Sequence, residues 1–149
     1  MGDNRQMSLL SAPDQQMLRE AMQGFTRPVT LLFFSQAIGC ETCDEARQIL
    51  AELPAASDRV TVEEVNLVLE KERAAAYGID RAPSIVVLSD GEDSRIRFIG
   101  SPGGYDFVSL VDGVLLAGGV NEQPLSAESV GLLEGVSEPT HLQVFVTPT

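Results

Sequence analysis

The two cysteines of this chain, Cys40 and Cys43, stand three positions apart in the segment GCETC, and the 149 residues contain no other cysteine. Thiols at this spacing can close a disulfide across one helical turn and can exchange it with another disulfide. They could also be half of a metal site, or two small apolar residues without any chemistry. The sequence on either side of the pair indicates which of these three roles (redox pair, metal ligands or inert residues) the cysteines have.

The segments on either side of the pair favour redox chemistry. Residues 27–36 form an apolar, β-branched and aromatic run typical of a central buried strand. Residues 43–53 have the apolar spacing of an amphipathic helix, with acids in the first turn and Pro54 as the expected stop. At such a helix N-terminus, free backbone N–H groups and the helix dipole favour a thiolate. We therefore expect Cys40 to be the attacking thiolate and Cys43 to be the buried, resolving thiol.

The chain offers too few ligands for a closed zinc site. Structural zinc takes four ligands, and the sequence offers two cysteines and a single histidine, His141, far along the chain. A closed site would need a second chain, so we expect no metal. An inert pair of cysteines stays open as an alternative.

Acidic residues surround the two thiols. Glu41 lies between them, and Asp44 and Glu45 follow directly. Their negative charges disfavour a thiolate and oppose the helix dipole. We expect Glu41 to modulate the acidity of the thiol. The resulting disulfide should be mild and rather reducing, on the order of −270 mV.

The other elements follow from the apolar periodicity and from Gly and Pro. The expected elements are helices over 13–25, 70–78 and 104–119, a strand over 59–68, a hairpin over 83–100 with an SDGEDS turn, a weaker helix over 126–134 and a strand-like segment over 141–149. Alternating strands and helices imply parallel crossovers, and the hairpin adds antiparallel strands. The fold class is therefore α/β, with a mixed central β-sheet flanked by helices on both faces.

Charge and hydropathy limit the partners. The formal net charge is −12, so nucleic acid and anionic membrane surfaces are excluded as expected partners. The first 16 residues lack a basic segment followed by an apolar core, and no apolar run is long enough to span a bilayer. We expect a cytoplasmic protein, a compartment in which a cysteine pair is more often catalytic or metal-binding than structural.

The order strand, C-x-x-C, helix, strand, helix and then an X-Pro step opening a hairpin resembles the thioredoxin fold. Three segments, CETCDEARQILAEL, YGIDRAPSIVVL and RFIGSPGGYDFVSLVDGVLLAGG, resemble the first unit of the glutaredoxin-like protein disulfide oxidoreductases. The stretch FIGSPGGYDFVSLV also resembles the N-terminal domain of the alkyl hydroperoxide reductase flavoprotein, where the first unit has generally lost its cysteines. The resemblance implies a cis Ala82–Pro83 bond, with Ala82 and Pro83 binding an extended substrate.

The resemblance also implies a division of the chain into three parts, and the sequence departs from thioredoxin at the cysteine pair. It implies an N-terminal extension over 1–12, a thioredoxin-like domain over 13–119, and a helix and strand over 120–149 similar to the start of a second unit. Thioredoxin has Trp before its cysteine pair and Gly-Pro within it. This chain has no Trp, and Gly39, Glu41 and Thr42 fill those places.

The sequence thus predicts a thiol–disulfide oxidoreductase that works in the reducing direction without a bound cofactor. Its expected partners are disulfide-containing proteins or peptides, with a thioredoxin-reductase-like flavoprotein or glutathione as external electron donor. The alternative is a non-catalytic thioredoxin-fold module that docks onto or supports a partner redox domain. The apolar segment 142–146 either pairs within the domain or mediates a homodimer.

Overall fold

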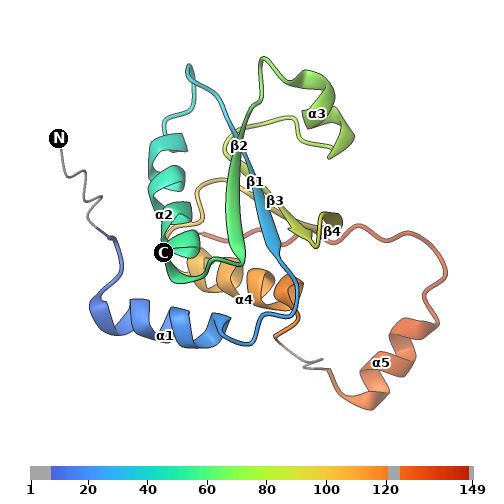
Figure 1. The fold of residues 1–149 in the computed structure, drawn as a ribbon. Helices are drawn as coiled ribbons and strands as arrows, with labels where there is room; N and C mark the ends of the chain where they lie inside the picture. The colour runs from blue at the N-terminus through green and yellow to red at the C-terminus, as the bar shows by residue number, and fades with distance from the viewer. Residues whose placement is uncertain (1–7, 121–124, 148–149) are drawn as a thin grey trace.

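A four-stranded sheet forms the centre of the protein (Figure 1). The computed structural model describes residues 8–120 and 125–147. The strands are β1 (Val29–Ser35), β2 (Val60–Asn66), β3 (Ser84–Ser89) and β4 (Glu92–Ile99). Their order is β2-β1-β3-β4; β1 and β2 are parallel, and the other two pairs are antiparallel. The mixed sheet is therefore confirmed, with β1 as one of its two inner strands.

Helices cover both faces of this sheet, as predicted. They are α1 (Ala12–Met22), α2 (Cys43–Ala56), α3 (Lys71–Ala76), α4 (Asp106–Gly118) and α5 (Ala127–Glu134). The larger core cluster joins α1, α2 and α4 to one face of the sheet, and a smaller cluster joins α3 to the other face (Figure 1). Helix α5 buries none of its residues.

The apolar run of β1 is explained by these two cores. Leu31 and Phe33 point into the larger cluster, whereas Leu32 and Phe34 point into the smaller one. All four side chains are fully buried. A strand covered on both faces needs apolar residues at every position rather than at alternate ones.

One of the two expected parallel crossovers is wrong. The chain passes from β1 through α2 to β2 in parallel, but β3 runs antiparallel to β1. Helix α3 has only six residues and so is about 9 Å long. A strand of seven residues extends over about 23 Å. The short helix does not carry the chain back along the length of the sheet. Strand β3 therefore starts at the same end of the sheet at which β1 and β2 finish, and it runs in the opposite direction.

Three local predictions also need correction. Helix α2 continues past Pro54 to Ala56, because a proline near the end of a helix removes one backbone bond without stopping the helix. The hairpin turn is only Asp90–Gly91, both at positive φ (51° and 81°), so Glu92 already belongs to β4. Residues 141–147 form no strand, and the side chains of Leu142 and Phe145 are 85% and 90% exposed.

The remaining elements agree with the sequence to within a few residues. Helix α1 ends at Met22 rather than at Phe25, because the chain turns there and inserts Phe25 against α4. Helix α4 ends at the double glycine as expected, with Gly119 in the left-handed conformation. The division into 1–12, 13–119 and 120–149 stays a prediction.

Candidate functional site

The cysteine pair lies at the junction of β1 and α2. Cys40 is in the loop that follows β1, and Cys43 is the first residue of α2. A disulfide joins them, with their Cα atoms 5.5 Å apart. Cys43 is 3% exposed and belongs to the larger core cluster, whereas Cys40 is only partly buried at the edge of that cluster. Of the two sulfurs, the one of Cys40 is therefore the more accessible to a partner.

The start of α2 suits an anionic sulfur. Thr42 occupies the N-cap position but makes no side-chain cap hydrogen bond, so its side chain does not satisfy the first-turn amides. Free amides and the helix dipole stabilise negative charge at this point. Asp44 and Glu45 in the same turn compete for that stabilisation. Glu41 is exposed to solvent between the two cysteines.

The Ala82–Pro83 step lies beside this junction. The peptide bond is cis, as the family resemblance implies. Ser84, the next residue, pairs with Phe34 near the end of β1, and the Pro83 carbonyl accepts a hydrogen bond from the Gly100 N–H at 2.8 Å. Ala82 and Cys40 both pack against the core cluster that contains Cys43. The structure thus brings Cys40, Cys43, Ala82 and Pro83 to one end of the sheet.

A polar network that the sequence analysis did not single out lies behind the pair. The Arg47 side chain from α2 donates to Glu64 of β2, with Nε–Oε2 and Nη2–Oε1 distances of 3.0 and 2.7 Å, and also to Asp44. The buried Ser35 hydroxyl donates to Glu64 Oε1 at 2.5 Å. The Arg47 guanidinium is the main cause that lowers the pKa of the Glu64 carboxyl. In the sequence, the one hint of this network was the position of Arg47, four residues after Cys43.

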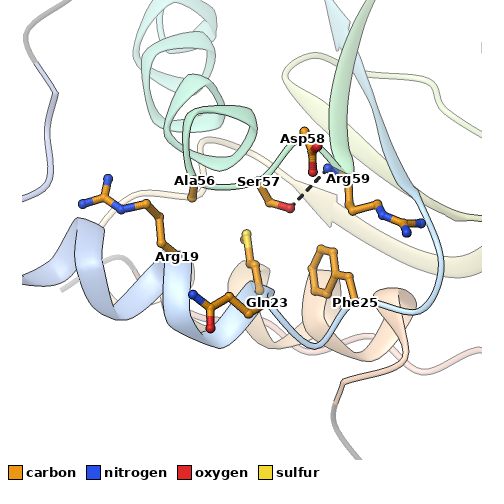
Figure 2. Close-up of a pocket in the computed structure, with 8 residues that line it drawn as sticks. Arg19, Gln23, Phe25, Ala56, Ser57, Asp58 and Arg59 are labelled. Atoms are coloured by element: carbon orange, nitrogen blue, oxygen red, sulfur yellow. Dashed lines mark hydrogen bonds between the residues drawn. The ribbon is translucent and has the colours of Figure 1, made fainter.

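One hollow of the described surface adjoins the site, and another lies far from it. A groove of about 460 Å³ runs along α2 beside the loop that follows β4; its lining includes Leu10, Glu45, Ile49, Pro102, Gly103 and Phe107. A pocket of about 320 Å³ lies at the opposite end of the sheet, between α1 and the end of α2 (Figure 2). Arg19 and Arg59 at its rim point away from one another (Figure 2), so they do not converge on a shared ligand.

Neither a metal-binding cluster nor a membrane-spanning helix is found among the described residues. Residues 8–120 and 125–147 contain no group of three or more histidine, cysteine or acidic side chains arranged to hold a metal ion. Within the same residues, each helix falls short of the length and apolar character that a bilayer span requires.

Known proteins resemble this chain in sequence and in structure. No family model matches it. The AhpF component of alkyl hydroperoxide reductase in Escherichia coli K12 is 32% identical over 119 residues, covering 80% of this chain and 20% of that protein. The N-terminal domain of AhpF in Enterococcus faecalis V583 superposes with a TM-score of 0.71 and 32% identity, over 80% of this chain and 57% of that one.

A second solved structure supports the fold alone. The protein disulfide oxidoreductase of Aeropyrum pernix K1 superposes with a TM-score of 0.69 at 20% identity, over 84% of this chain and 54% of that one. Thioredoxins share the same fold. The chain spans about a fifth of the length of the curated relatives it matches. This chain is therefore a thioredoxin-fold protein with a C-x-x-C disulfide, homologous to the N-terminal domain of alkyl hydroperoxide reductase AhpF and similar in fold to protein disulfide oxidoreductases.

Proposed function

We propose that this chain is a thiol–disulfide oxidoreductase that reduces disulfides through Cys40 and Cys43. The observation that carries the proposal is the disulfide at the start of α2, formed by one partly exposed and one buried cysteine. An exposed sulfur can be reached by a protein substrate, and a buried neighbour is protected until it is needed to resolve the intermediate. The AhpF relatives are components of an enzyme named a reductase, which supports the reducing direction.

The exchange takes place in two steps. The Cys40 thiolate attacks one sulfur of the substrate disulfide, forms a mixed disulfide and expels the other substrate sulfur as a thiolate. Cys43, after losing its proton to solvent, attacks the Cys40 sulfur and releases the second substrate thiolate. The substrate gains two electrons, and the protein is left with the Cys40–Cys43 disulfide. An external dithiol or flavoprotein must return two electrons to complete the cycle.

The neighbouring residues have proposed supporting roles. The Ala82 backbone and Pro83 would hold an extended substrate chain next to Cys40, because they lie at the same end of the sheet as the pair. Glu41 would make the thiolate less favourable, because its exposed carboxylate lies between the two cysteines.

The electron donor and the compartment are also proposals. A flavoprotein reductase is the first candidate donor, in view of the resemblance to a component of alkyl hydroperoxide reductase. Glutathione is the second. We place the protein in the cytoplasm, where a mild and reducing pair would be kept as a dithiol.

Insulin reduction in the presence of dithiothreitol tests the proposed activity. The wild-type protein should accelerate the precipitation of the insulin B chain, and Cys40→Ser should reduce the rate to that of dithiothreitol alone. Cys43→Ser removes the resolving thiol. When it is first reduced and then freed of dithiothreitol, it should accumulate a covalent complex with insulin, visible on a non-reducing gel. A wild-type protein that gives no acceleration, or a Cys40→Ser variant that is fully active, would refute the proposed activity.

The second candidate function is a docking module without catalysis. The observation in its favour is the exposed apolar segment 142–146, in which Leu142, Val144 and Phe145 are each more than four-fifths exposed. Such a segment suits contact with another domain or chain. This module would be inactive with insulin and would instead form a stable complex with a separate redox domain.

A further inference from the structure

Arg47 bridges two carboxylates next to the cysteine pair. It lies four residues after Cys43, and hence close to it on the same side of α2. Its Nη1 donates to Asp44, which directly follows Cys43, while Nε and Nη2 bind the two oxygens of Glu64. This fork-like contact to Glu64 fixes the plane of the guanidinium group.

The network is fixed to the sheet at the end of β1. Glu64 is the register partner of Phe33, and the Arg47 guanidinium lies 5.8 Å from the centre of the Phe33 ring. Ser35, the last residue of β1, is 6% exposed and donates to Glu64 Oε1. The contacts therefore join β2 to β1 and to the first turns of α2. Of these three elements, β1 and α2 lie on either side of the loop that carries Cys40.

Arg47 is also the only positive charge in this part of the sequence. No other lysine or arginine occurs between Arg27 and Arg59. Glu41, Asp44 and Glu45 all lie within two positions of a cysteine. Without Arg47, the carboxylate of Asp44, which directly follows Cys43, and the carboxylate of Glu64 would both lose their positive partner.

We propose that Arg47 is a positioning residue that sets the reduction potential of the Cys40–Cys43 pair by holding the carboxylates of Asp44 and Glu64 in ion pairs. The inference rests on the proposed function. Reduction of the disulfide takes up two electrons and one proton and gives a Cys40 thiolate and a Cys43 thiol. Uncompensated carboxylates disfavour this thiolate, so the loss of Arg47 favours the disulfide and makes the potential more negative.

Arg73 provides a matched control. It makes an ion pair with Glu63 at 2.6 Å, from α3, on the other face of the same strand β2. The side chains of Arg73 and Arg47 are similarly exposed, at 35% and 43%. Arg73→Gln therefore removes the same charge and a similar ion pair, but on the side of the sheet away from the cysteines.

The experiment is a titration of the full chain against reduced and oxidised glutathione, read by alkylation and mass spectrometry. It is done at pH 9, above the ordinary thiol pKa of about 8.5, so that the thiolate is the reduced species. Arg47→Gln should raise the equilibrium constant for disulfide formation about three- to tenfold, which is about 15 to 30 mV in potential. Arg73→Gln should stay within about twofold of the wild type. Arg47→Lys keeps the charge but loses the fork-like contact, so it should shift the constant less than Arg47→Gln does.

Two further variants separate this role from a merely structural one. Asp44→Asn added to Arg47→Gln should return the constant at least halfway to the wild-type value, because it removes one uncompensated charge. Glu64→Gln alone should shift the constant in the opposite direction, and it tests the proposal even if Arg47→Gln fails to fold. An Arg47→Gln constant within twofold of the wild type, an equal shift in Arg73→Gln, or no recovery in the double variant would overturn the inference.

The same titration distinguishes failure of the inference from failure of the proposed function. A wild-type pair that shows no reversible two-electron transition overturns the proposed function, and this inference with it. A wild-type pair that titrates normally, beside an Arg47→Gln pair with the same constant, overturns the role of Arg47 alone.

Discussion

At the scale of single residues, the site is defined by the ion pair behind the cysteines as well as by the cysteines themselves. Glu64 receives hydrogen bonds from Arg47 and from Ser35, and both lower the pKa of its carboxyl from the ordinary value of 4.5. Arg47 contributes more to this effect than Ser35. The contact therefore stabilises the folded state whenever Glu64 is ionised.

This coupling makes stability depend on pH with a defined sign. A carboxyl with a lowered folded-state pKa contributes stability that is complete above its unfolded value and is lost as the pH falls through the folded value. Wild type should therefore be more stable than Glu64→Gln at pH 7, and the difference should shrink below about pH 4.5. Because the Glu64 side chain is 41% exposed, we expect a difference of at most about 1 kcal/mol at pH 7.

Urea unfolding at pH 7 and at pH 3 measures this difference. Glu138→Gln, at an exposed position outside the helices and strands, is the control and should match the wild type at both values. A Glu64→Gln variant whose loss of stability is equally large at pH 3 and pH 7 would contradict the assignment.

At the scale of the elements, the close approach of α4 to the start of β1 depends on a glycine. The Gly118 carbonyl accepts hydrogen bonds from the Thr26 and Arg27 N–H groups at 2.9 and 3.2 Å. A Cβ atom at Gly118 would lie 2.6 Å from the ring of Phe25, which is itself buried. The small residue thus lets the end of the helix pack on the aromatic ring.

Two glycines of α4 give a matched pair of variants. Gly118→Ala should destabilise the protein by about 1–3 kcal/mol, because the ring of Phe25 must move. Gly113→Ala, in the interior of the same helix, should be neutral or stabilising by up to about 1 kcal/mol. Its Cβ would meet Phe98 at 3.5 Å, an ordinary contact distance. Free energies of unfolding in urea test both variants, and an equal effect at the two positions would refute the packing argument.

At the scale of the whole molecule, the segment after α5 leaves apolar side chains in solvent. Leu142 and Phe145 are 85% and 90% exposed, and α5 buries none of its own residues. Exposed apolar strips of this kind favour association with another surface. We expect the wild-type chain to self-associate as its concentration rises.

Sedimentation velocity over a range of concentrations tests this expectation. The double variant Leu142→Asp/Phe145→Asp should stay monomeric where the wild type associates, and its free energy of unfolding should be unchanged because neither side chain is buried. Leu132→Asp, at a 72% exposed position of α5, controls for the added charge and should associate like the wild type. Association that survives the double variant would place the contact elsewhere.

The sequence by itself determined the features that depend on neighbouring residues. The apolar run of β1, the amphipathic α2 with Cys43 at its start and the double-glycine end of α4 were all correctly predicted. Each is a local pattern, in which the period of apolar residues or a glycine fixes the backbone. The position of the C-x-x-C pair between a buried strand and a helix follows from the same patterns.

Tertiary structure decided what depends on residues distant in sequence. The absence of a strand over 141–147 and the ion pair of Arg47 with Glu64 had no local signal. The direction of β3 was settled by how far the short α3 carries the chain along the packed sheet. Arg47 and Ser35 reach Glu64 across 17 and 29 positions of the chain. A strand also needs a neighbour that supplies its hydrogen bonds, so an apolar and β-branched segment alone does not make one. Contacts of this kind exist only after the elements have packed, and they are therefore properties of the fold rather than of any one segment.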